Sequence, residues 1–157
     1  TSVDQVVNAV TQQKKQYTDL AQSSQVLEQQ FAQVLASQIF DSELVDLSKC
    51  QVIVAQVKQC HDVKRLRLIL DACYAKSTGP LLMTLIGNAQ HQKSPMVIAV
   101  DSELAKRVSA RDLLNELKTY AQVKAGGKPT MVQGTIDCNN FSELRENILA
   151  WVKNAIS

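Results

Sequence analysis

At residues 125–134 the sequence reads Ala125-Gly126-Gly127-Lys128-Pro129-Thr130-Met131-Val132-Gln133-Gly134, a choice of residues that ordinary packing explains poorly. Two adjacent glycines reach backbone angles closed to other residues, and Pro129 then fixes the chain behind them. We expect this stretch to be a loop between two helices, in which exposed amides and Lys128 form a concave anion site. The alternative is a plain helix-to-strand turn, because glycine and proline are common in turns.

The sequence around this stretch alternates between strand and helix patterns. Residues 50–57 are rich in β-branched side chains, which is typical of a strand, and 81–87 with 96–100 form a predicted hairpin. Helices are predicted at 63–75, 109–120 and 141–156, with caps at Asp62, at Ser109 with Asp112, and at Asn140 or Ser142. Residues 130–136 add a possible further strand. The pattern predicts an α/β fold, with helices covering a small sheet of about three or four strands.

Residues 1–40 contain neither glycine nor proline, and their apolar side chains recur in steps of three and four. This heptad pattern predicts a long helix that pairs in a left-handed coiled coil. The seam residues are Val3, Val6, Val10, Tyr17, Leu20, Leu27, Phe31 and Val34, with Gln13, Ser24 and Gln38 as polar interruptions.

We expect this helix to join two copies of the chain as a homodimer, because a single apolar stripe gains most of its stability from burial. Packing against its own chain is the alternative. The sequence thus divides into a helical coiled-coil arm, residues 1–45, and a globular part, residues 46–157.

Residues 126–134 resemble the glycine-rich signature GGGRPDMAQ in the C-terminal domain of alanyl-tRNA synthetases, the C-Ala domain of the DHH-associated type. The order of the predicted elements from about residue 46 to the end is similar to that domain, and a coiled segment before it also suits the family. The resemblance implies the α/β fold that the pattern predicts.

The chain departs from the family's signature at several positions. Ala125 stands where the family usually has glycine, Lys128 replaces arginine, Thr130 replaces aspartate, and Thr135-Ile136 replace a second glycine pair. A lysine keeps the positive charge but lacks the planar fork that grips phosphate at two points. Electrostatic contact with an RNA backbone therefore suits these residues better than a tight nucleotide pocket.

The resemblance also implies a function. It indicates a noncatalytic module of an alanine-tRNA ligase that binds the outer corner, or elbow, of tRNA, dimerises, and aids aminoacylation and editing. Basic side chains would neutralise phosphates, and Met131 would pack on unstacked bases. The expected RNA-binding residues are Lys106, Arg107, Arg111, Lys118, Lys124, Gly126, Gly127, Lys128 and Met131. The alternative is a coiled-coil assembly module that has lost RNA binding.

The remaining residues limit other functions. With 157 residues, 45% of them hydrophobic, the chain can bury one sizeable core, and its net charge of +2 does not by itself indicate a nucleic-acid binder. The Asp-His-His signature of DHH phosphoesterases is absent, as are ATP-binding and editing-site motifs, so we expect no catalytic site and no cofactor in this chain. Since the chain starts at Thr1, we expect a fragment of a longer ligase.

The cysteines and the hydropathy of the chain indicate in which cellular compartment we expect the protein. Cys50, Cys60, Cys73 and Cys138 show neither a metal-binding spacing nor a disulfide framework, and Cys60-His61 has no second pair to complete a metal site. We therefore expect no metal and a reducing, cytoplasmic location. No run of about twenty apolar residues is present, so we expect no membrane partner.

Overall fold

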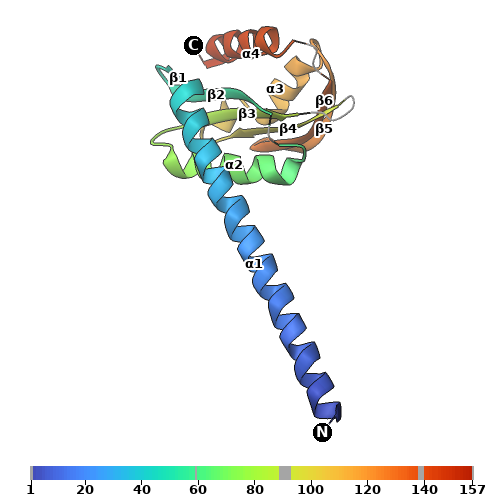
Figure 1. Cartoon of the computed structure of the whole chain (residues 1–157). Helices are drawn as coiled ribbons and strands as arrows, with labels where there is room; N and C mark the ends of the chain where they lie inside the picture. Colours follow the sequence, from blue (N-terminus) through green and yellow to red (C-terminus); the bar gives the residue numbers. More distant parts are fainter. Residues whose placement is uncertain (1, 59, 89–92, 138–139, 157) are drawn as a thin grey trace.

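The computed structural model describes residues 2–58, 60–88, 93–137 and 140–156. A long helix leads into a mixed helix-and-strand body and projects from it (Figure 1). The bounds are α1 Ser2–Glu43, β1 Leu44–Leu47, β2 Cys50–Val57, α2 Val63–Lys76, β3 Leu81–Gly87, β4 Ser94–Val100, the 3-10 helix η1 Leu104–Lys106, α3 Ala110–Leu117, β5 Gln122–Lys128, β6 Met131–Asp137 and α4 Phe141–Ile156.

The strands form one sheet of six strands in the order β1-β2-β3-β4-β6-β5. Strands β2 and β3 run parallel, and the other neighbouring pairs are antiparallel, including the predicted β3–β4 pair. The α/β class is confirmed, but the expected three or four strands are too few. The missed strands carry weak signals, because β1 has four residues directly after α1, and β5 has Gly126 and Gly127 where a strand usually has β-branched residues.

The predicted helix caps are confirmed in the structure. Asp62 accepts a hydrogen bond from the backbone N–H of Arg65 at 2.8 Å, and Ser109 and Asp112 form a reciprocal capping box at the start of α3. Of the two candidates for α4, Asn140 accepts from the N–H of Glu143 at 3.2 Å. These local bonds satisfy amides that a helix start leaves without partners, so the sequence alone locates the starts of α2 and α3 and narrows the start of α4 to two candidates.

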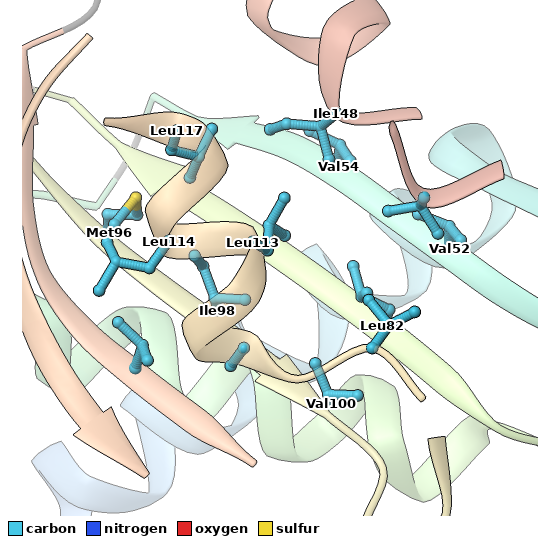
Figure 2. Close-up of a cluster of buried hydrophobic side chains, with 14 of the residues drawn as sticks. Val52, Val54, Leu82, Met96, Ile98, Val100, Leu113, Leu114, Leu117 and Ile148 are labelled. Atoms are coloured by element: carbon cyan, nitrogen blue, oxygen red, sulfur yellow. The ribbon is translucent and has the colours of Figure 1, made fainter. Parts of the chain in front are cut away.

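Helices cover both faces of the sheet. On one face α3 and α4 pack on alternate residues of β2, β3, β4 and β6; Leu113 and Ile148 lie over Val54, Leu82 and Ile98 (Figure 2). On the other face, α2 and the end of α1 pack on the intervening residues of the same strands. Because successive strand residues point to opposite faces, the central strands β3 and β4 are buried along almost their whole length and the body has three layers.

The end of α1 is bound to the body by buried and polar contacts. Ala32, Leu35, Ala36 and Ile39 are the buried residues of α1 and belong to the same core as α2. Arg145 of α4 donates from Nε to the carbonyl oxygen of Val54 at 3.2 Å and forms an ion pair with Glu43 at 3.3 Å. The end of α1 therefore packs beside α2 on one face of the sheet, and an ion pair at its last residue links it to α4.

The predicted seam of α1 is exposed along its whole length. Tyr17 is 76% exposed and Phe31 is 50% exposed, and the other apolar seam residues are similarly open. The buried residues Ala32 and Leu35 follow the seam residues Phe31 and Val34 by one position, so the two stripes are separated by about 100° around the helix. The body thus holds α1 by one stripe while the seam faces solvent.

Thr84, in the middle of β3, is the buried polar side chain of the core, and its hydroxyl has no hydrogen-bond partner among the described residues. We expect Thr84→Val to raise the free energy of unfolding by about 1 kcal/mol, because it removes an unsatisfied hydroxyl and keeps the shape. Urea denaturation measures this as a higher midpoint at an unchanged slope. Thr84→Ser is the matched control, which keeps the hydroxyl and loses a methyl group, and is expected to destabilise. A lower midpoint for Thr84→Val would contradict the assignment.

Candidate nucleic-acid interface

The glycine-rich stretch is a β-hairpin, so the expected loop between two helices is wrong. Residues 122–128 form β5 and residues 131–137 form β6, which pair from Gln122 opposite Asp137 to Lys128 opposite Met131. Alternate amides of the edge strand β5 bond to β6 and the others point outward along an extended strand, so they do not converge on one anion as they would in an open loop. The further strand expected at residues 130–136 is confirmed.

The turn of this hairpin is anchored through its carbonyl groups. Arg111 of α3 donates to the carbonyl oxygen of Gly127 from Nε at 2.9 Å and from Nη2 at 2.7 Å. The N–H of Ala110 donates to Pro129 at 2.7 Å, and the N–H of Val100 donates to Thr130 at 2.9 Å. The groups that the turn directs at α3 and β4 are therefore carbonyl acceptors, which do not form an anion site. Arg111 holds the hairpin against α3.

The glycines of the hairpin differ in what surrounds them. Gly127 has φ +157°, and a Cβ there would overlap the carbonyl oxygen of Met131. A Cβ on Gly134 would lie 2.5 Å from Ala125 Cα and closer still to the carbonyl oxygen of Lys124. Both residues are therefore required by close backbone approach. Gly126 has open space where a Cβ would be, so the fold itself does not require a glycine there.

Two of the predicted basic residues meet at one hollow. Lys118, the C-cap of α3, and Lys124 of β5 line a cavity of about 340 Å³ together with Lys93, which precedes β4. We call this the lysine hollow; its remaining lining residues are Ala121, Gln122, Val123 and Thr135. The sequence offers no signal for Lys93, because this lysine stands alone in a polar connection and joins the others only through the sheet.

Lys106 and Arg107 lie elsewhere. They line a separate cavity of about 370 Å³ with Lys49, which lies in the turn between β1 and β2. Lys106 is also paired with Glu103, Nζ to Oε2 at 3.1 Å, which partly neutralises it. The structure thus divides the predicted basic residues among three places: Lys118 and Lys124 line the lysine hollow, Lys106 and Arg107 line this second cavity, and Arg111 and Lys128 lie at the hairpin turn.

The last two predicted residues lie opposite each other near the hairpin turn. Lys128 is exposed, and its register partner Met131 is half-buried against the core that α1 and α2 share. Part of the Met131 side chain therefore packs against the core.

The cysteines and His61 were the other candidates for reactive or metal-binding side chains. Burial raises the pKa of the Cys73 thiol to about 11 and also raises the pKa of Cys50 and Cys60, so these thiols stay protonated at neutral pH. Cys138 lies outside the described residues.

His61 contacts the carbonyl oxygen of Asn88 through Nδ1 at 3.3 Å. Within the described ranges no three His, Cys, Asp or Glu side chains lie close enough together to hold a metal ion.

Among the described residues, none of the helices combines sufficient length with sufficient apolar character to cross a bilayer.

Comparison with known families gives a match over most of the chain. A model of the DHHA1 domain matches residues 49–154. Alanine–tRNA ligase from Idiomarina loihiensis is 26% identical over 133 residues, and the one from Pseudoalteromonas translucida is 30% identical over 142 residues. Each alignment covers 85% of this chain but 15% and 16% of the two relatives, so the chain spans a small part of their length.

A solved structure shares the fold. The C-Ala domain of Aquifex aeolicus alanyl-tRNA synthetase superimposes with a TM-score of 0.58 over 72% of this chain and 96% of that domain, at 14% sequence identity. At this identity the likeness concerns the fold alone. Together with the family match, it confirms the resemblance on which the expected residues depend.

Proposed function

The chain belongs to the DHHA1 domain family, and from this premise we propose that it is a noncatalytic tRNA-binding accessory module of an alanine–tRNA ligase. The observation that carries the proposal is the family match, with alignable relatives that are alanine–tRNA ligases. The tRNA is the large anionic substrate of such an enzyme, and phosphate contacts by lysine are the usual source of affinity for it. The exposed Lys124 and Lys128 would supply such contacts.

The hairpin adds a second supporting feature. Gly126 has no internal reason to be glycine and lies between Lys124 and Lys128, whose side chains point to the same side of β5 because residues two apart share a face. A strand glycine without internal contacts is typical of a place where another backbone approaches closely. We therefore include contact of the tRNA elbow with this hairpin in the proposal, in support of aminoacylation and editing by the attached enzyme.

The second component of the proposal is dimerisation through the arm. In this proposal the arm comprises residues 1–45, and residues 46–157 form the globular part. The exposed seam supports it, because solvent-exposed apolar residues at heptad spacing are typical of a helix that pairs. Leu27 and Phe31 of the seam also line a cavity of about 300 Å³ with Leu68 of α2, which would receive part of a partner helix. The proposal includes a cytoplasmic location, which accords with the free, buried Cys50, Cys60 and Cys73.

One alternative has its own support. An assembly module that has kept the arm but lost RNA binding would also expose the seam, and Lys128 and Thr130 depart from the glycine signature. The two functions differ in what happens to RNA binding, which the following experiment measures.

We expect the purified chain to bind whole tRNA with micromolar or tighter affinity, little discrimination between tRNAs, and a logarithmic salt slope that reports released counterions. Fluorescence anisotropy over about 50 to 200 mM salt measures both quantities. Lys124→Ala with Lys128→Ala is expected to weaken binding roughly tenfold and to lower the slope by about two. A mononucleotide should bind far more weakly. Absence of tRNA binding at low salt, with a concentration-dependent dimer, would favour the assembly module.

A further inference from the structure

The lysine hollow gathers its charge from three elements that are distant in the sequence. Lys93 precedes β4, Lys118 caps α3 and Lys124 lies within β5. The side-chain ammonium group of none of the three forms an ion pair or hydrogen bond with another described residue. Like charges that converge without a partner raise the local potential, and an anion that enters the hollow lowers it.

The acidic residues nearby leave this charge uncompensated. Among the described residues, no acidic side chain lines the lysine hollow. Asp137 lies opposite Gln122 in the sheet and lines the adjoining cavity with Lys118, and the carboxylate of Glu116 accepts a hydrogen bond from the Tyr120 hydroxyl at 2.7 Å. One carboxylate beside three lysines leaves a net positive site on a chain whose total charge is only +2.

Neutral donors extend the site along the sheet edge. Thr135 is half-buried, lies opposite Lys124, and its hydroxyl has no hydrogen-bond partner among the described residues. Strand β5 is the last of the sheet, so alternate N–H groups along it point away from β6. Point-charge lysines with hydroxyl and amide donors form the set that binds phosphate oxygens.

We propose that the lysine hollow is a seat for backbone phosphates of RNA, with Lys93 as a contact residue outside the glycine signature. This inference rests on the proposed function and specifies where on the module the RNA backbone lies. None of the described lining residues is aromatic, so they offer no stacking surface and suit contact with the backbone rather than the bases. The hollow therefore adds affinity that is independent of sequence.

The test compares two double variants of the full chain that lose the same charge. Lys93→Ala with Lys118→Ala removes two lysines of the hollow, and Lys14→Ala with Lys15→Ala removes two exposed lysines of the arm, far along the sequence from it. Binding of whole tRNA is measured over the same salt range for wild type and both variants. We expect about tenfold weaker binding and a slope lower by about two for the hollow variant. The arm variant should stay within twofold of wild type.

The outcomes separate the two proposals. If wild type binds no tRNA, both the proposed function and the phosphate seat fail. If wild type binds and both variants match it, the module binds RNA elsewhere and only the seat fails. Equal losses in both variants would indicate a general charge effect and also overturn the seat. Inorganic phosphate and a poly-glutamate peptide serve as competitors; displacement of tRNA by the peptide as efficiently as by a second tRNA would assign the hollow to acidic proteins instead.

Discussion

Gly134→Ala is expected to lower the free energy of unfolding by about 2–3 kcal/mol, whereas Gly126→Ala should change it by less than about 0.5 kcal/mol. The two glycines belong to paired strands of one hairpin, yet their surroundings differ. An alanine Cβ at Gly134 would overlap the backbone of Lys124 and Ala125, which cannot move without breaking the β5–β6 ladder. At Gly126 the same methyl group would enter open space.

Chemical denaturation of the two variants makes this comparison directly. Each variant adds the same atoms, so their difference reports the close strand approach rather than loss of glycine flexibility in the unfolded chain. Hydrogen exchange of amides in β5 and β6 should rise in Gly134→Ala before that of the central strands. Equal stability of the two variants would show that the strands do not approach closely at Gly134.

Leu20→Glu with Leu27→Glu is expected to raise the dimer dissociation constant at least about 100-fold, a loss of about 3 kcal/mol of association free energy. Both side chains are exposed in the single chain, at 67% and 65%, and neither belongs to the core, so we expect the body to remain folded in this variant. In a paired arm each leucine enters the seam, and a glutamate there would have to be desolvated without a partner. Sedimentation over a concentration series measures the constant.

A matched variant adds the same charge to the other side of α1. Gln12→Glu with Gln25→Glu lies outside the heptad seam, and we expect its dissociation constant to stay within about threefold of wild type. The seam variant should also lose helical circular dichroism, because an unpaired helix of this kind is marginal in water. If both variants remain dimeric, the arms do not pair through the seam.

RNA binding and dimerisation, the two components of the proposal, use different parts of the molecule. The lysine hollow lies on the globular part at the β5 edge, whereas the seam occupies the arm between Val3 and Val34. Variants in one are therefore expected to leave the other intact, since distant sites without shared partners contribute additively. A seam variant that still binds tRNA with an unchanged salt slope would fit this separation.

Some features of the candidate interface follow from local sequence and others do not. The basic side chains and the glycine signature are visible in the sequence, and Lys118 and Lys124 do lie together. Their neighbour Lys93 is separated from them by more than twenty residues and carries no local signal. Conversely, Lys106 and Arg107 are near Arg111 in the sequence but line another cavity with Lys49.

The sequence by itself determined the periodic and local features: the heptad spacing of the arm, the apolar strands, and the caps at Asp62 and Ser109. Each depends on residues within a few positions of one another, where backbone hydrogen bonding and side-chain spacing act directly. Tertiary structure alone decided that residues 122–128 form the edge strand, that α1 packs by the stripe beside its seam, and that Lys93 joins the hollow. These features depend on which distant segments pair and pack, and β5, with its glycines, has little strand preference until β6 lies beside it.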